Sequence, residues 1–235
     1  MSRSTVLLVF AVACALPAAA DEYWVSYQGN DFPENEGWTR TFSDKNGVFG
    51  QGGAIRTFEN GALVLDSLRS VMIVDFYEMS RPIDPDPGEL FIMRWRLKID
   101  SVPGHRDPGV GVFADAFTGV SLEFSETNLF SRLEQTFSAN FEPDVFHVFE
   151  LRSYDMAAYE LSIDGTPALI GRFMPIGNPS RVAWGDVIQG GTSVTRWDYF
   201  EFGVVPEPSA LLCILSGSLP LLAKRRKPTL LRSKS

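Results

Sequence analysis

Cysteine is nearly absent from this sequence, and the two that occur lie toward its ends. Cys14 falls in residues 1–20 and Cys213 in residues 204–235. The long stretch between, residues 21–203, contains none, which excludes disulfide staples, thiolate zinc sites and cysteine nucleophiles there. A domain formed by this stretch must therefore be stabilised by its own hydrophobic core.

Histidine and the common catalytic motifs are also scarce. His105 and His147 are the only histidines and lie far apart in the chain, so they give no metal-ligand spacing. No Gly-x-Ser-x-Gly sequence occurs, which disfavours the usual serine hydrolase arrangement. We find no complete catalytic motif and expect no enzymatic activity.

Basic residues are few in the central stretch. Residues 21–203 carry 14 basic and 28 acidic residues, whereas residues 204–235 carry six basic residues against one acidic residue, Glu207. So acidic a stretch repels phosphate backbones, which disfavours nucleic acid as a partner. The excess of carboxylates favours solubility, and it is compatible with a neutral ligand or with binding of a polyvalent cation.

The amino-terminal residues are typical of a secretory signal peptide. Arg3 precedes an apolar run from Val6 to Leu16, and three alanines, residues 18–20, precede Asp21. This pattern predicts a signal helix over residues 1–20, cleaved after Ala20, and hence export. A lipoprotein box ending at Cys14 is the alternative, but it leaves a short apolar run before the cysteine.

Residues 21–203 read as a single, nearly all-β domain. Short runs of alternating apolar and polar residues are separated by Gly, Pro, Asn and Asp, and only Asn128–Ser138 has a trace of helical period. We expect nine to thirteen strands, with Asp164-Gly165 turning a hairpin. The predicted strand runs cover residues 61–67, 71–79, 90–101, 110–115, 120–126, 145–153, 159–173, 181–186 and 195–203.

Two segments of this domain carry a resemblance to a known fold. "FHVFELRSYDMAAYELSIDGTPALIGRF" (146–173) and "VAWGDVIQGGTSVTRWDYFEFG" (182–203) resemble the concanavalin A-like jelly rolls, which include laminin-G-like, lectin and glucanase groups. The resemblance implies a two-sheet antiparallel jelly-roll sandwich. Glucanases of this fold place Glu-x-Asp-x-x-Glu on one strand, whereas this chain has one Glu-x-Asp, at Glu142 and Asp144, and His147 at the third position.

The carboxy-terminal residues 204–235 have three parts. Pro206-Glu207-Pro208 is followed by an apolar run, residues 210–223, and by the basic cluster Lys224, Arg225, Arg226 and Lys227. This arrangement resembles the PEP-CTERM sorting signal of bacteria that make exopolysaccharide. The resemblance implies an exosortase-type membrane protease as partner and a hydrophobic helix held transiently in the inner membrane. The run is shorter than the about 20 residues of a typical span, and its basic cluster should stay on the cytoplasmic side.

Three sets of residues are candidates for ligand contact. Trp184 and Trp197 could stack on sugar rings, although large aromatics at alternating strand positions usually belong to the core. The cations Arg94, Arg96 and Lys98 alternate with the apolar residues Met93, Trp95 and Leu97, so the cations share one face of the strand. This face could bind an anionic glycan, or its cations could form salt bridges with neighbouring strands. Asp44 and Asn46, in the loop 43–53, could bind calcium, the one cofactor considered, or simply form a turn.

We therefore expect an exported cell-envelope or extracellular-matrix protein, sorted through its carboxy-terminal residues, that binds carbohydrate or exopolysaccharide weakly. A glycoside-active enzyme of the same fold and a passive structural surface protein are the alternatives. The expected organisation is a signal peptide at 1–20, a β-sandwich at 21–203 and a sorting segment at 204–235.

Overall fold

The computed structural model describes residues 23–44, 46–69, 72–103, 108–114, 118–132, 137–175, 179–186 and 192–206. These residues form strands, loops and one short 3-10 helix, η1 (Pro33–Glu36). The strands are β1 (Tyr23–Tyr27), β2 (Thr39–Asp44), β3 (Ile55–Glu59), β4 (Ala62–Asp66), β5 (Met72–Met79), β6 (Glu89–Ser101), β7 (Pro108–Phe113), β8 (Gly119–Phe124), β9 (Asn128–Ser131), β10 (Phe137–Asn140), β11 (His147–Ser153), β12 (Ala158–Ile163), β13 (Thr166–Arg172), β14 (Arg181–Asp186) and β15 (Val194–Pro206).

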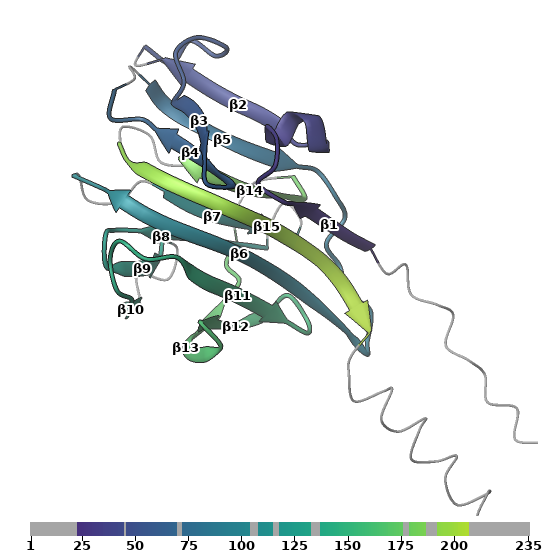
Figure 1. The fold of residues 1–235 in the computed structure, drawn as a ribbon. Helices are drawn as coiled ribbons and strands as arrows, with labels where there is room; N and C mark the ends of the chain where they lie inside the picture. Colours follow the sequence, from purple (N-terminus) through teal and green to yellow (C-terminus); the bar gives the residue numbers. More distant parts are fainter. Residues whose placement is uncertain are drawn as a thin grey trace, which may run out of the picture.

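The strands form two antiparallel sheets that face each other (Figure 1). The eight-stranded sheet has the order β13-β12-β11-β6-β15-β4-β3, and β1 pairs with β15 beyond the part of β15 that pairs with β4. The seven-stranded sheet has the order β10-β9-β8-β7-β14-β5-β2. The predicted all-β, two-sheet antiparallel sandwich is confirmed.

Two hairpins of the eight-stranded sheet have the same two-residue turn. Asp164 and Gly165 join β12 to β13 with φ of 51° and 76°, and Asn60 and Gly61 join β3 to β4 with φ of 54° and 81°. Two successive positive φ values define a type I′ turn, whose twist matches the twist of the flanking strands. The predicted Asp164-Gly165 hairpin is therefore confirmed.

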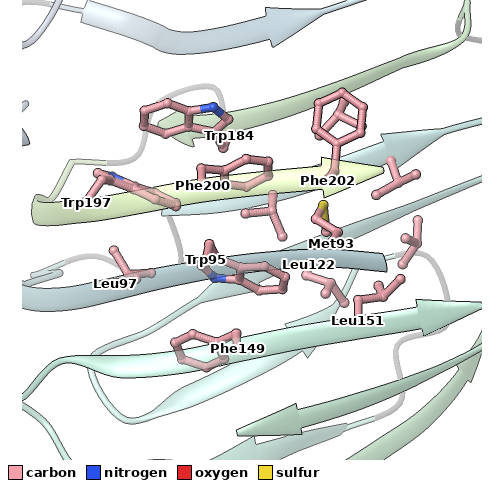
Figure 2. Packing of buried hydrophobic residues seen from close by; sticks show 14 of the residues in the cluster. Met93, Trp95, Leu97, Leu122, Phe149, Leu151, Trp184, Trp197, Phe200 and Phe202 are labelled. Atoms are coloured by element: carbon pink, nitrogen blue, oxygen red, sulfur yellow. The ribbon is translucent and has the colours of Figure 1, made fainter. Parts of the chain in front are cut away.

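Aromatic rings from both sheets fill the space between them (Figure 2). Trp95 of β6 stacks on Phe149 of β11, with ring centroids 5.4 Å apart. Trp184 of β14 stacks on Phe200 of β15 at 5.5 Å, and so joins the seven-stranded sheet to the eight-stranded sheet. These contacts replace covalent cross-links in a domain without cysteine, because each buried aromatic contributes roughly 2–3 kcal/mol.

The predicted strand positions hold, but three expectations are corrected. The described residues form fifteen strands, more than the nine to thirteen expected, because short or mostly exposed strands such as β3 show little apolar alternation. The window with a trace of helical period, Asn128–Ser138, contains β9 and the start of β10, because Leu129 points into the core while Phe130 does not, as in a strand. The domain also extends past residue 203, since β15 continues to Pro206 and Val204 is buried beside β1. The expected signal helix and carboxy-terminal hydrophobic helix lie outside the described residues. Within the described ranges no helix has the length and apolar character that crossing a membrane requires.

Candidate functional site

The stacking of sugars on Trp184 and Trp197 is contradicted by their burial. Neither indole is exposed, and the two ring centroids lie 4.9 Å apart in the core (Figure 2). A ring without an exposed face cannot stack on a ligand. Alternation places these side chains on one face of a strand, and in a sandwich the face with the large aromatics is the inner one.

The cationic row on β6 is neutralised by the neighbouring strands. Arg94 pairs with Glu150 of β11 and with Glu201 of β15, and Arg96 pairs with Asp198 of β15. Burial tends to lower the pKa of Arg94, but the hydrogen bond to Glu150 and the charges of Glu150 and Glu201 together outweigh burial, so the net pKa is raised. The salt-bridged interpretation of this row is confirmed, so an anionic glycan would have to displace existing ion pairs.

The tryptophan that reaches solvent is Trp24, with 42% of its surface exposed, whereas the other four are almost completely buried. It lies on β1 opposite Gly203 of β15, and its indole N–H donates to Glu201 Oε2 at 3.3 Å. This hydrogen bond orients the ring. Trp24 is not among the predicted ligand contacts. It lies on a short strand close to the expected cleavage site, and so short a strand has too few alternating residues to distinguish an outward-facing position from a core position.

Trp24 lines an open pocket of about 540 Å³ at the junction of the two sheets. Its walls come from β1 of one sheet, from η1 and its following glycine, and from the start of β2 and the end of β5 of the other sheet; β1 and η1 lie close together (Figure 1). We call this the Trp24 pocket. Its lining residues are Trp24, Val25, Ser26, Glu36, Gly37, Thr39, Met79, Ser80 and Arg81.

Glu36 is fixed in this pocket by the backbone of the neighbouring segment. The N–H of Gln28 donates to Glu36 Oε2 at 3.1 Å, and η1 ends at Gly37, whose φ of 90° turns the chain toward β2. Burial raises the pKa of Glu36, the hydrogen bond from Gln28 partly offsets the rise, and the charge of Asp31 adds to it. Glu36 thus presents a positioned carboxyl group to the pocket.

Arg81 brings a cation to the same pocket. It lies two residues after the end of β5 and is exposed, and its guanidinium has no ion pair or hydrogen bond with any residue in the described ranges. Three hydroxyl groups complete the polar lining, those of Ser26, Thr39 and Ser80. The Trp24 pocket therefore combines an aromatic face, a carboxyl group, a guanidinium and several hydroxyls, none of which the sequence analysis selected.

The loop 43–53 is a turn held by the carboxylate of Asp44. Asp44 Oδ1 accepts the backbone N–H groups of Asn46 at 2.9 Å and of Val48 at 2.8 Å, and Asp44 Oδ2 accepts the amide of Asn46 at 3.3 Å. Among the described residues no group of three or more His, Cys, Asp or Glu side chains could hold a metal. These hydrogen bonds form the turn that was the alternative to a calcium site at Asp44 and Asn46.

Glu142 and Asp144 lie in the exposed loop before β11, as the proline between them predicts. Asp144 has a φ of 62°, so the segment is a turn and not a rigid strand that could hold a catalytic pair. His147 follows, with Nε2 2.8 Å from the carbonyl oxygen of Glu142 and Nδ1 2.6 Å from Asp164 Oδ2. These two contacts tie the turn to the Asp164-Gly165 hairpin.

Carboxylates on the outer face of the seven-stranded sheet are too widely spaced to act as a glycosidase pair. Glu123 of β8 and Glu78 of β5 are separated by β7 and β14, so three inter-strand steps place them at least about 14 Å apart. Paired glycosidase carboxylates lie roughly 5–9.5 Å apart. Each is also paired with an arginine, Glu123 with Arg132 and Glu78 with Arg181.

The residues of the sorting motif are only partly described. Pro206 is the last residue of β15, opposite Glu89 of β6. Glu207, Pro208 and the cluster Lys224, Arg225, Arg226 and Lys227 lie outside the described residues.

No protein-family model matches this sequence, and no curated protein matches it. Solved structures are similar in fold at low identity. An endo-1,3-beta-glucanase from Streptomyces sioyaensis is 12% identical, with 82% of this chain and 100% of that chain covered and a TM-score of 0.53. A protein of unknown function from Shewanella oneidensis MR-1 is 10% identical, with coverages of 78% and 86% and a TM-score of 0.51.

The binding domain of Paraclostridial Mosquitocidal Protein 1 is 11% identical, with a TM-score of 0.46 and 77% of this chain covered. This chain spans about half of that structure, 52% of its length. The glucanase from Streptomyces sioyaensis has this two-sheet fold, and at 12% identity the likeness shows the fold alone. The fold is thus an antiparallel jelly-roll sandwich of the concanavalin A-like class, as the two resembling segments predicted.

Proposed function

We propose that this protein is an exported cell-envelope or extracellular-matrix protein that binds a carbohydrate polymer without cleaving it, and that the Trp24 pocket is the binding site. The observation that carries the proposal is the exposed indole of Trp24, oriented by Glu201 at the wall of a polar pocket. Sugars have apolar faces that pack on aromatic rings and hydroxyls that need polar partners, and this pocket supplies both kinds of contact.

The fold and the arrangement of carboxylates support this choice among the alternatives. The glucanase from Streptomyces sioyaensis acts, by its name, on a 1,3-beta-glucan, which makes carbohydrate a natural ligand class to test for this chain. The spacing of Glu123 and Glu78, and the loop position of Glu142 and Asp144, favour binding over hydrolysis.

Binding is tested by affinity electrophoresis of the protein through gels that contain neutral or acidic polysaccharides. Trp24→Ala should weaken binding to the retained polymer by about thirtyfold, because roughly 80 Å² of apolar contact at 25 cal/mol/Å² is worth about 2 kcal/mol. Tyr154→Ala, which removes an exposed aromatic side chain that does not line the pocket, is the matched control and should bind normally. Lack of retardation by every polymer would favour the passive protein, and release of sugar would favour the enzyme.

The sorting part of the proposal rests on the resemblance of residues 204–235 to the PEP-CTERM signal. Pro206 belongs to β15, so changing it could disturb the sandwich as well as the motif. Glu207→Ala combined with Pro208→Ala leaves the strand intact. This double variant should accumulate in the inner-membrane fraction instead of reaching its normal location. Normal distribution of the variant between cell fractions would refute sorting by this motif.

A further inference from the structure

The lack of a partner for Arg81 distinguishes it from the arginines on the sheet faces. Arg94, Arg96 and Arg196 each pair with carboxylates of their own or adjacent strands. Arg81, at the wall of the Trp24 pocket, has no such partner among the described residues, although the domain has twice as many acidic as basic residues. A guanidinium left without a carboxylate in so acidic a domain is available to an anion from outside.

The other groups of the pocket exclude a simple inorganic anion as its full occupant. A small anion would neutralise Arg81 but would leave the ring face of Trp24 uncovered. A neutral sugar would cover Trp24 and donate hydroxyls to Glu36, but would leave Arg81 without a counter-charge. A sugar that carries a carboxylate satisfies all three groups at once.

Resting on the proposed function, we infer that the Trp24 pocket binds an acidic sugar unit of a polysaccharide. The ring lies on Trp24, its carboxylate accepts hydrogen bonds from Arg81, and its hydroxyls donate to Glu36 and exchange hydrogen bonds with Ser26, Thr39 and Ser80. The ligand class is thus a uronic-acid-containing polymer.

The acidic character of the whole domain does not prevent an acidic sugar from binding to the Trp24 pocket. At physiological ionic strength charges are screened over about 8 Å, so the affinity depends on the groups at the pocket. Glu36 is the carboxyl that lines it, and one of its oxygens already accepts the N–H of Gln28. Low salt should weaken binding of the polymer through repulsion by the domain as a whole, which is opposite to the behaviour of a basic polyanion-binding protein.

The test compares polymers that differ only in the charge of the carboxyl group. The full-length protein is titrated by calorimetry with polygalacturonate, alginate and hyaluronate, and with the methyl ester of each. The protein should bind at least one acid form more tightly than its ester by roughly 10- to 100-fold, the range expected for hydrogen bonds to a charged partner.

Arg81→Gln should reduce the affinity for that acid more than the affinity for its ester, so that the preference for the acid disappears. Arg69→Gln removes an exposed guanidinium that pairs only with Asp66, away from the pocket, and should keep the preference. Equal binding of acid and ester by the wild-type protein, or an equal loss with both arginine variants, would overturn the acidic-sugar inference while leaving carbohydrate binding intact. No binding of any polymer, acid or ester, would overturn the proposed function as well.

Discussion

At the scale of single residues, two carboxylates face each other inside the sandwich. Asp186 of β14 is the cross-strand partner of Asp75 of β5, and both are completely buried. Asp75 is neutralised by Arg40. Among the described residues, Asp186 accepts hydrogen bonds from the hydroxyls of Ser193, at 2.8 Å, and of Ser67; burial, together with the charge of Asp75, raises its pKa from 3.8 to about 7.

This raised pKa makes the stability depend on pH. Between about pH 4 and 7 the unfolded chain has lost the Asp186 proton while the folded protein keeps it, so the free energy of unfolding should fall as the pH rises, by at most roughly 1.4 kcal/mol per unit. Above pH 7 the fall should stop. Asp186→Asn, which keeps a neutral group of the same size, should remove this slope in urea unfolding measured at several pH values.

The control is Asp84→Asn, which changes an exposed carboxylate and should keep the wild-type slope. If Asp186→Asn and the wild-type protein lose stability in parallel from pH 4 to 7, Asp186 does not hold its proton in the folded state.

The predictions from the sequence were least complete for single side chains. Alternation correctly placed Arg94 and Arg96 on a face opposite Trp95. It could not select Trp24 or Arg81, because the first lies on a five-residue strand and the second in an irregular segment after β5. What joins these two side chains in one pocket is the packing of β1 beside β15, a long-range pairing that no local pattern encodes.

At the scale of elements, the attachment of β1 builds the site. Gly29 follows β1 with a φ of 71°, and a Cβ there would lie 2.7 Å from the carbonyl oxygen of Gly61 and closer still to that of Asp198. Both contacts are with backbone atoms, which cannot move aside as a flexible side chain could. Gly165 has a nearly equal φ of 76°, but its Cβ would meet nothing within 4 Å.

Substitution of these two glycines distinguishes the free-energy cost of backbone strain from the cost of a close contact. Gly165→Ala should cost about 1–2 kcal/mol, the penalty of the left-handed conformation alone. Gly29→Ala should cost about 1–3 kcal/mol more, through the clash, and should weaken carbohydrate binding because β1 and η1 shift. Urea unfolding of both variants gives the comparison. Equal losses of stability would mean that β1 is not packed against the backbone as closely as described.

Element types could be predicted where turn chemistry and alternation agreed. Asp164-Gly165 gave the hairpin between β12 and β13, whereas Asn60-Gly61, an equally strong signal, followed the unrecognised strand β3, whose residues are mostly exposed. A strand with little burial shows no apolar alternation. The expected helical period over Asn128–Ser138 was wrong for a different reason. Two short strands in succession can place apolar residues four positions apart, as a helix does.

At the scale of the whole molecule, a sandwich without disulfides is held by aromatic packing between its two sheets (Figure 2). The large tryptophans that could have served a ligand, Trp184 and Trp197, serve this core instead. The proposed carbohydrate binding therefore rests on Trp24, the exposed tryptophan at the junction of the sheets. Of the five tryptophans only Trp24 is therefore exposed to solvent, so its fluorescence can report on the proposed binding site.

Acrylamide quenching of tryptophan fluorescence is the most direct test of the central claim that a carbohydrate polymer lies on Trp24. In the free protein the readily quenched emission should come from Trp24 and should be absent in Trp24→Phe, because the other tryptophans are buried. Saturation with a polysaccharide that the protein binds should protect this emission in the wild-type protein. Binding that leaves the quenching of Trp24 unchanged would contradict the account.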